Sequence, residues 1–262
     1  MKLTIVKIGG NVLDDEVALN QFLLDFATVE GPTILVHGGG KMATRLGDKL
    51  GIQPHYVKGR RITDSSTLEL VTMVYGGWIN KMLVAKLQQA GCNGIGLTGA
   101  DGHLIKGVKR PVKDVDFGWV GDIEPEGVNV DLIKTLLNGG IVPVVAPLSL
   151  GEGTVLNTNA DTIASVLAIA LSSHYPVRLI FCFEKKGVLL DVQDEKSSIS
   201  HLTENEYRQL LEKGVLADGI LPKLENAFHA LHKGVREVLI GHAEDLLVNT
   251  TGHTVGTLIT RE

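Results

Sequence analysis

Two glycine-rich turns and a nearby lysine form the pattern in this sequence most able to do chemistry. The apolar run Thr33–Val36 leads to Gly38-Gly39-Gly40, and the first apolar run ends in Lys7-Ile8-Gly9-Gly10. Glycine leaves backbone N–H groups open to an anion, and the N-terminus of a following helix adds partial positive charge. A lysine beside such turns supplies the full charge that a transferring phosphoryl group needs. A glycine triplet alone would indicate only a tight turn, but the pair of turns predicts a phosphate site.

Two lysines occupy positions that an ordinary surface lysine would avoid. Lys7 lies in an otherwise apolar segment, where its charge is costly unless it has an anionic partner. Lys223 closes the motif Asp218-Gly-Ile-Leu-Pro-Lys, near the start of a predicted helix where the helix dipole disfavours a cation. A bound phosphate would remove both conflicts. The alternatives are an edge lysine with its charge in water at position 7 and a surface lysine at position 223.

Two further polar motifs could hold a substrate. The segment Asn157-Thr-Asn-Ala-Asp161 opens an apolar helix with more polar groups than capping requires, so Asp161 could orient lysines. The segment Lys58-Gly-Arg-Arg-Ile-Thr63 offers arginine, the planar two-pronged partner of a carboxylate. The plain alternatives are helix caps for the first segment and a solvated basic loop for the second.

Composition restricts the class of protein. The chain has 262 residues, 44% of them hydrophobic and 21% charged, with a net charge of −5. This mild acidity argues against nucleic-acid binding, and no apolar run approaches the ~20 residues of a membrane span. The N-terminus lacks a signal peptide, and the two cysteines, Cys92 and Cys182, are expected to be reduced core thiols of a cytoplasmic protein. Neither a zinc site nor a Ser-His-Asp or Cys-His arrangement can be argued from the spacing.

The elements that must position these residues alternate short β-branched runs with amphipathic stretches, which predicts βαβ units and a mostly parallel sheet. The segment 103–121 is expected to form a hairpin anchored by Trp119, and a boundary near Ser172–Pro176 would separate lobes 1–175 and 176–262. The expected strands are Leu3–Ile8, Thr33–His37, Gly94–Leu97, Ile141–Ala146, Arg178–Phe183 and Glu237–Ile240. The expected helices are Glu16–Thr28, Lys41–Leu50, Thr67–Gln89, Val130–Asn138, Ala160–Leu171, Thr203–Lys213 and Leu221–Lys233.

Taken together and in this order, the five motifs at Lys7, Val36–Gly40, Gly59–Thr63, Leu156–Asp161 and Asp218–Lys223 resemble the amino acid kinase family. The resemblance covers essentially the whole chain. It implies a three-layer αβα sandwich with a mostly parallel central sheet. Within the family the motifs are most similar to the branch that phosphorylates the γ-carboxylate of N-acetyl-L-glutamate in the second step of arginine biosynthesis. The implied cofactors are ATP and Mg²⁺, with the metal carried by the nucleotide and not by a protein site.

The resemblance also implies roles for particular residues. Lys7 and Lys223 would stabilise the transition state and Asp161 would organise them. The N-terminal lobe would bind the acylated glutamate and mediate dimerisation, and the C-terminal lobe would bind the nucleotide. The implied substrate-binding residues are Gly39, Gly40, Arg61 and Asn157. The implied phosphate- and nucleotide-binding residues are Gly9, Gly10, Glu184, Lys185, Lys186, Gly187, Val188, Leu189, Val215, Leu216 and Ala217. A γ-carboxylate is already ionised at neutral pH, so the reaction needs no general base.

Two departures from the family pattern leave alternatives open. Many relatives carry Asp-Val-x-Gly where this chain has Glu184–Gly187, and Arg60 replaces an apolar residue where the acyl group would lie. An extra cation there would suit a succinyl group in place of acetyl. The chain starts at its first strand without the additional helix of arginine-inhibited relatives, so an arginine-insensitive homodimer is expected. Carbamate kinase, glutamate 5-kinase, aspartokinase, uridylate kinase and a catalytically silent regulator of the same fold are the alternatives.

Overall fold

The helices and strands largely follow the alternation that the sequence predicts. The computed structural model describes residues 1–57, 59–191, 193–216 and 220–261. The helices are α1 (Gly10–Asp14), α2 (Glu16–Ala27), α3 (Gly40–Leu50), α4 (Ser65–Val71), the π-helix η1 (Thr72–Ile79), α5 (Asn80–Gln89), the 3₁₀ helix η2 (Asp101–His103), α6 (Val130–Asn138), α7 (Ala160–Leu171), the 3₁₀ helix η3 (Glu195–Ser197), α8 (Glu204–Glu212), α9 (Leu221–His232), the 3₁₀ helix η4 (Ala243–Asp245) and α10 (Leu246–Thr250). The strands are β1 (Leu3–Ile8), β2 (Thr33–His37), β3 (Tyr56–Val57), β4 (Arg60–Arg61), β5 (Gly94–Leu97), β6 (Ile105–Lys109), β7 (Gly121–Val128), β8 (Val142–Val145), β9 (Leu148–Gly151), β10 (Thr154–Asn157), β11 (Val177–Phe183), β12 (His201–Thr203), β13 (Glu237–His242) and β14 (Thr257–Thr260).

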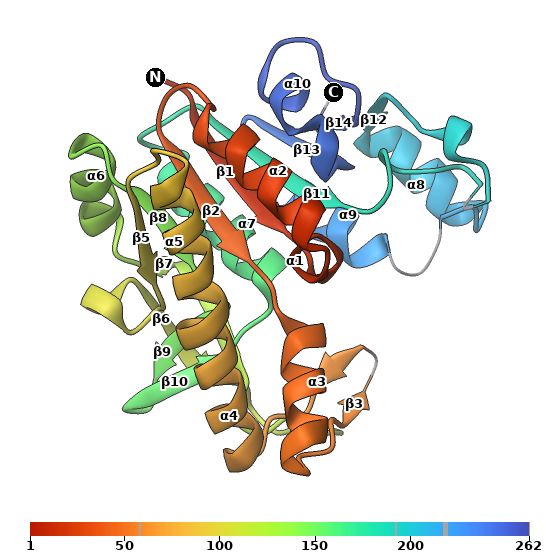
Figure 1. Ribbon diagram of the computed structural model, residues 1–262. Coiled ribbons are helices and arrows are strands. Elements are labelled where there is room, and N and C mark those ends of the chain that lie inside the picture. Colours follow the sequence, from red (N-terminus) through yellow and green to blue (C-terminus); the bar gives the residue numbers. More distant parts are fainter. Residues whose placement is uncertain (58, 192, 217–219, 262) are drawn as a thin grey trace.

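A central sheet of eight strands organises the molecule (Figure 1). Its order is β12-β14-β13-β11-β1-β2-β8-β5, and the strands from β13 to β5 are parallel. Strand β14 runs antiparallel to β13 and parallel to β12. Because β11 pairs with β1 along its length, the sheet continues across residue 175, where the sequence places a lobe boundary.

Helices cover both faces of this sheet, which confirms the predicted three-layer αβα architecture. On one face, α7 contacts β1, β2 and β11, while α9 contacts β13 and β14. On the other face, α5 contacts β5 and β8, and α2 packs on α5 and α10. Two buried clusters of hydrophobic side chains fill the space between the layers. None of the described helices is long and apolar enough to span a bilayer.

The alternation of side chains along β1 decides where Lys7 points. Leu3 and Ile5 belong to the cluster on the α7 face, while Val6 and Ile8 belong to the opposite cluster. Successive residues of a strand face opposite sides of the sheet, so Lys7 shares the face of Leu3 and Ile5. It lies at the carboxyl end of the strand, under the start of α7.

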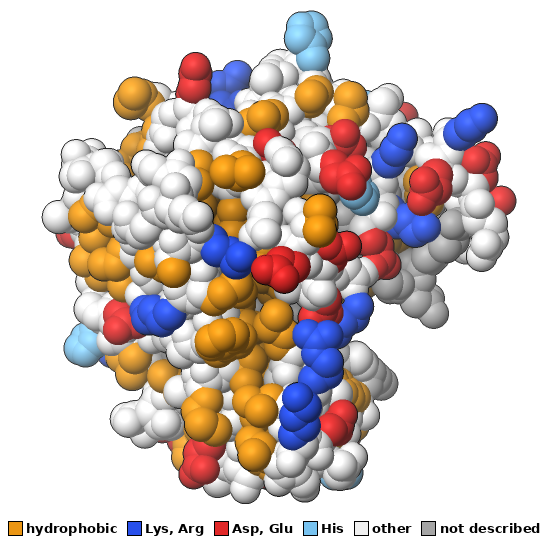
Figure 2. Space-filling view, viewed as in Figure 1, with side chains coloured by type: hydrophobic (Ala, Val, Ile, Leu, Met, Phe, Trp, Pro, Cys, Tyr) orange, Lys and Arg blue, Asp and Glu red, His pale blue; other side chains and the backbone are white. Residues whose placement is uncertain are grey.

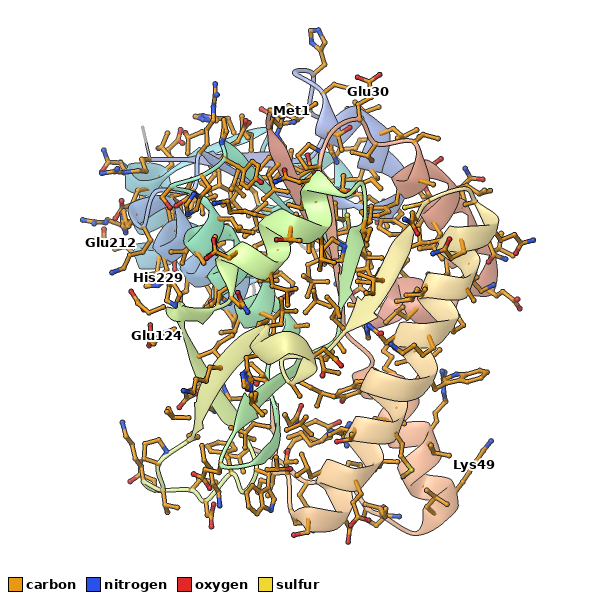
Figure 3. The ribbon with its side chains drawn as sticks, turned by 90° about the vertical axis from the view of Figure 1, so that its left-hand side faces the viewer. Met1, Glu30, Lys49, Glu124, Glu212 and His229 are labelled. Carbon is orange, nitrogen blue, oxygen red and sulfur yellow. The ribbon has the colours of Figure 1, made fainter. Side chains whose placement is uncertain are left out.

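Two parts of the chain differ in detail from the expected elements. The helix expected over Thr67–Gln89 is interrupted by the π-helix η1, although Figure 3 shows α4 to α5 as one long helical rod. A hairpin forms from β6 and β7, but β7 begins at Gly121, where the expected hairpin of 103–121 ends, and the two strands join β9 and β10 in a separate four-stranded sheet. The strands β9 and β10, which pair with each other in antiparallel register, were not predicted.

Candidate active site

Lys7, Asp161 and Lys223 come together at the carboxyl ends of the central strands. The Nζ atom of Lys7 lies 2.7 Å from Oδ1 of Asp161, and Nζ of Lys223 lies 2.7 Å from Oδ2. The three side chains are only 10%, 13% and 17% exposed, in the order Lys7, Asp161, Lys223. Asp161 lies in the first turn of α7 and Lys223 in the first turn of α9, two helices that pack against each other.

This triad carries a net positive charge. Burial alone would raise the pKa of Asp161, but the ion pairs and hydrogen bonds with both lysines lower that pKa to about 2. Asp161 is therefore ionised at neutral pH and compensates one of the two ammonium groups. The remaining charge among these largely buried side chains favours binding of an anion.

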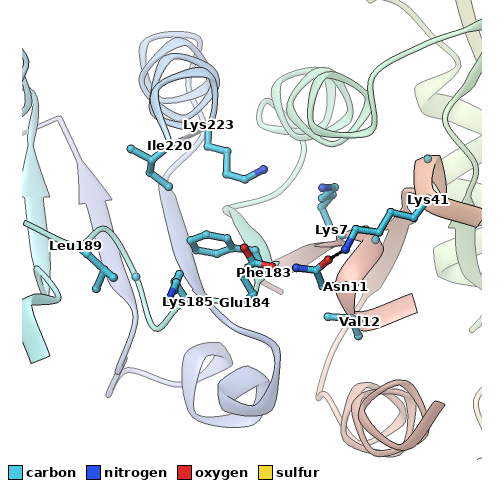
Figure 4. A pocket seen from close by; sticks show the side chains of 14 residues that line it. Lys7, Asn11, Val12, Lys41, Phe183, Glu184, Lys185, Leu189, Ile220 and Lys223 are labelled. Carbon is cyan, nitrogen blue, oxygen red and sulfur yellow. Dashed lines mark hydrogen bonds between the residues drawn. The ribbon is translucent and has the colours of Figure 1, made fainter. Parts of the chain in front are cut away.

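A cavity of about 530 Å³, which we call the phenylalanine cavity, opens on one side of the triad (Figure 4). At one end its lining includes the apolar side chains of Phe183, Leu189 and Ile220, with Glu184 and Lys185 beside them. At the other end are the glycine turn of β1 and the side chains of Lys7 and Lys223. An apolar end and a cationic, glycine-rich end suit a ligand that combines a flat ring with phosphates.

A second cavity, of about 800 Å³, opens on the other side of the triad, and we call it the arginine cavity. Its lining includes Arg60, Arg61, Arg110 and Asn157, together with the glycine turn after β2. Both cavities are lined by Lys7, Gly10 and Gly40, so they meet at the two glycine turns. A group bound in one cavity can therefore contact a group bound in the other beside Lys7.

The turn after β2 requires glycine at position 39. Gly39 has a φ of 154°, and a Cβ there would lie 2.9 Å from Cδ1 of Tyr75 and closer still to Ile79. Both of these residues belong to the π-helix η1. The π-helix thus packs its side chains directly on the turn, and such helices often occur at functional sites.

Arg61 and Arg60 are neighbours with different environments. Arg61 is buried, donates hydrogen bonds to the Gly40 carbonyl at 3.0 Å and to Oγ1 of Thr44 at 2.8 Å, and stacks on Tyr56. Arg60 is exposed and lines the same cavity. Arg61 therefore also holds the backbone of the turn, while the guanidinium of Arg60 has no hydrogen-bond or ion-pair partner among the residues that the structure describes.

The polar side chains around the start of α7 have different partners. Oδ1 of Asn159 accepts a hydrogen bond from the Thr162 N–H and caps the helix. Asn157 donates through Nδ2 to Oγ1 of Thr63 at 2.9 Å and lines the arginine cavity. Only one of the three polar residues is thus used as the N-cap, which leaves Asp161 for the lysines.

The residues expected around the nucleotide fall into two groups. Gly9, Gly10, Glu184, Lys185, Gly187 and Leu189 line the phenylalanine cavity. Among the described residues, Lys186, Val188, Val215 and Leu216 are not part of that lining. Val188 is fully buried and donates its N–H to Oγ1 of Thr257. The predicted nucleotide-binding residue Ala217 lies outside the described residues. The same holds for Asp218 and Gly219 of the Asp218–Lys223 motif and for Lys58 of the arginine motif.

Several lining residues were not identified from the sequence. Asn11, Lys41, Phe183 and Ile220 line the phenylalanine cavity, and Tyr56, Tyr75 and Arg110 line the arginine cavity. Asn11 and Lys41 directly follow the two glycine turns, so position alone could have indicated them. No such signal exists for Tyr75 or Arg110, which reach the cavity from the middle of a helix and from a loop after β6. Within the described part of the chain, no group of three or more His, Cys, Asp or Glu residues is placed to hold a metal ion.

The fold and this site define a class of protein, and the sequence comparison agrees. The sequence model of the amino acid kinase family matches residues 2–242, and the chain belongs to that family. The solved N-acetylglutamate synthase from Neisseria gonorrhoeae, complexed with coenzyme A and N-acetyl-glutamate, has the same fold. It superposes with a TM-score of 0.84 at 22% identity, over 99% of this chain and 59% of that one.

Two relatives with a much higher sequence identity than this synthase share one name. An acetylglutamate kinase of Phocaeicola vulgatus is 54% identical over 91% of this chain and 93% of its own length. An acetylglutamate kinase of Cytophaga hutchinsonii is 52% identical over 98% of this chain and 97% of its own length. The resemblance predicted from the five motifs is thereby confirmed.

Proposed function

We propose that this chain transfers the γ-phosphoryl group of ATP to the side-chain carboxylate of N-acetyl-L-glutamate, the second step of arginine biosynthesis. The observation that carries the proposal is the Lys7–Asp161–Lys223 triad at the junction of the two cavities. The names of the relatives at 54% and 52% identity support the same reaction.

The reaction depends more on the positions and charges of the site residues than on proton transfer. The acceptor is a carboxylate, with an ordinary pKa near 4.3, and it attacks the phosphorus without a base. The bond between the γ-phosphorus and the bridging oxygen of ATP breaks, and ADP leaves with the electron pair. Lys7 and Lys223 balance the charge of the moving phosphoryl group, and the amides of the two glycine turns are available to its oxygens. Asp161 keeps the two ammonium groups at a fixed separation.

The nucleotide is assigned to the phenylalanine cavity and the acylated amino acid to the arginine cavity. Leu189 and Ile220 offer an apolar surface for a base, while Arg61 and Asn157 offer partners for a carboxylate and an amide. This assignment supports an acceptor-binding lobe at 1–175 and a nucleotide-binding lobe at 176–262, although Lys7, Gly9 and Gly10 of the first lobe also line the phenylalanine cavity. Mg²⁺ would bind the phosphates of the nucleotide and spread their charge, since Mg²⁺ typically keeps most of its ligands from phosphate and water.

A coupled assay of ADP release with a panel of acceptors tests this function. The purified chain should phosphorylate N-acetylglutamate and leave glutamate and carbamate nearly unused. Preference for carbamate or free glutamate would assign the chain to another branch of the family. Nucleotide binding without turnover on any acceptor would favour a silent regulator.

Arg60 favours a second acceptor, N-succinyl-L-glutamate. Arg60 and Arg110 both line the arginine cavity, and Arg110 is already paired with Asp122 at 2.5 Å. Among the described residues, Arg60 has no carboxylate within salt-bridge distance. The second carboxylate of a succinyl group would pair with it. A kcat/KM on succinylglutamate no better than on acetylglutamate would exclude this acceptor.

The exposed face of the α4–η1–α5 rod supports the expected homodimer. Met73 and Trp78 are 54% and 67% exposed, and Figure 2 shows hydrophobic side chains gathered over this rod. Large apolar groups of this kind mark contact surfaces. Light scattering should give twice the chain mass for the unmodified protein and a smaller mass for Trp78→Asp. A monomer at micromolar concentration would contradict the dimer.

A further inference from the structure

Among the described residues, four lysines line the phenylalanine cavity, and one of them has little compensation for its charge. Lys7 and Lys223 contact Asp161 at 2.7 Å, and Lys185 lies 3.5 Å from Glu195. Lys41 has its nearest described carboxylate, Asp14, at 4.0 Å. That carboxylate is already occupied by Arg45 at 2.7 Å.

The position of Lys41 in α3 adds to this imbalance. Lys41 is the second residue of the helix, directly after the glycine turn. A cation in the first turn opposes the helix dipole, which favours an anion there. The helix has no acidic residue in its first turn that would offset the effect.

The side chain of Lys41 is directed toward the cavity. Its Cγ and Cδ lie 3.7 and 3.8 Å from where a Cβ of Gly10 would be, so the stem crosses the first glycine turn. Its ammonium donates a short hydrogen bond to Oδ1 of Asn11 (Figure 4). This contact uses the amide oxygen of Asn11 and leaves the Nδ2 group as a donor to a ligand. Figure 4 shows Lys41, Lys7 and Lys223 pointing into the same end of the cavity.

We infer that Lys41, positioned by Asn11, is a third phosphate-binding lysine that contacts the β- and γ-phosphate oxygens of the nucleotide. The inference rests on the proposed function for the identity of the ligand, because the assignment of the cavity to ATP is part of that proposal. The triad retains one uncompensated positive charge, and Lys41 with Arg45 around Asp14 retains another. Two such charges on opposite sides of the glycine turn suit a polyphosphate, whereas an uncharged ligand would leave both of them uncompensated.

Titration calorimetry with ADP and with AMP tests the inference, using Lys41→Met and the matched control Lys49→Met. Lys49 belongs to the same helix but lies at its outer end, away from the cavity (Figure 3). The Kd of ADP should rise roughly tenfold in Lys41→Met, at the low end for a charge-assisted hydrogen bond because the side chain is 62% exposed. The Kd of AMP should not change, and Lys49→Met should bind both nucleotides as the unmodified chain does. The KM for ATP should follow the Kd of ADP.

The outcomes separate this inference from the proposed function. Equal ADP affinities for Lys41→Met and Lys49→Met, or an equal loss of ADP and AMP binding in Lys41→Met, would overturn the role of Lys41. ADP binding needs no acceptor substrate, so this result stands even where acyl-glutamate turnover is absent. A chain that binds no adenine nucleotide at all would overturn both proposals.

Discussion

The buried amide of Asn80 fixes the tautomer of His37, the residue that precedes the second glycine turn. Nδ2 of Asn80 donates to the Val144 carbonyl at 2.9 Å and lies 3.1 Å from Nε2 of His37. A carbonyl oxygen only accepts, so the amide nitrogen must face it, and Nε2 must then accept from the same NH₂ group. Nδ1 of His37 therefore carries the proton and donates to the Gly38 carbonyl at 2.8 Å. A neutral imidazole thus holds the first peptide of the turn.

This arrangement predicts a loss of stability in mild acid. Burial lowers the pKa of His37 from 6.5 to about 4, although the hydrogen bond to Gly38 opposes the shift. The unfolded chain takes up a proton below pH 6.5 while the folded chain does not. The free energy of unfolding should therefore fall between pH 6.5 and about 4, by up to roughly 3 kcal/mol from this residue.

Urea titrations at several pH values measure this contribution. The variant His37→Asn removes the titrating ring and keeps a donor near the Gly38 carbonyl. The difference in slope between the two proteins gives the contribution of His37. Identical slopes between pH 6.5 and 4 would show that His37 is not buried as a neutral ring.

Lys7→Ala should lower kcat by roughly 10²–10³, the effect of losing one donor to a developing charge. The KM for ATP should change less, because Lys223 and the glycine amides remain. Lys2→Ala is the matched control, since Lys2 lies just before the other end of β1 and away from both cavities. Initial rates with saturating acceptor give both constants. A kcat near that of the unmodified chain would remove Lys7 from the reaction.

Asp161→Asn should lower kcat by a similar factor, about 10² or more, while both lysines are still present. The amide cannot compensate either ammonium, so the two cations repel each other and lose their fixed separation. Asp161→Glu serves as the second variant, because it keeps the charge and moves it by one methylene. Partial recovery of kcat in Asp161→Glu is expected, whereas full activity of Asp161→Asn would contradict the organising role.

Gly39→Ala should destabilise the fold by about 1–3 kcal/mol, through its φ of 154° and its collision with Tyr75 and Ile79. Gly40→Ala is the control for stability, since a Cβ at Gly40 would meet no atom within 4 Å. Thermal unfolding compares the two variants. A Tm of Gly39→Ala equal to that of Gly40→Ala would mean that the turn adapts to a side chain.

Much of the layered architecture was predictable from local pattern. Every strand expected from a run of β-branched residues forms, and Leu3–Ile8, Thr33–His37 and Gly94–Leu97 have the expected bounds. A buried parallel strand is apolar along its whole length, so its signal is continuous and strong. The short strands β9, β10, β12 and β14 have no such signal, because their pairing depends on neighbours distant in sequence.

The candidate phosphate-binding residues could be identified without coordinates: the glycine turns, the lysines in unfavourable positions and the surplus polar groups before α7. These are local violations of packing or capping rules, and such violations can be detected without coordinates. The folded arrangement was needed to show that Lys7 and Lys223 share one carboxylate, that η1 packs on Gly39, and that Lys41 and Asn11 face the same cavity. Contacts of this kind join segments dozens to hundreds of residues apart, and no local preference of the chain encodes the separation between their side chains.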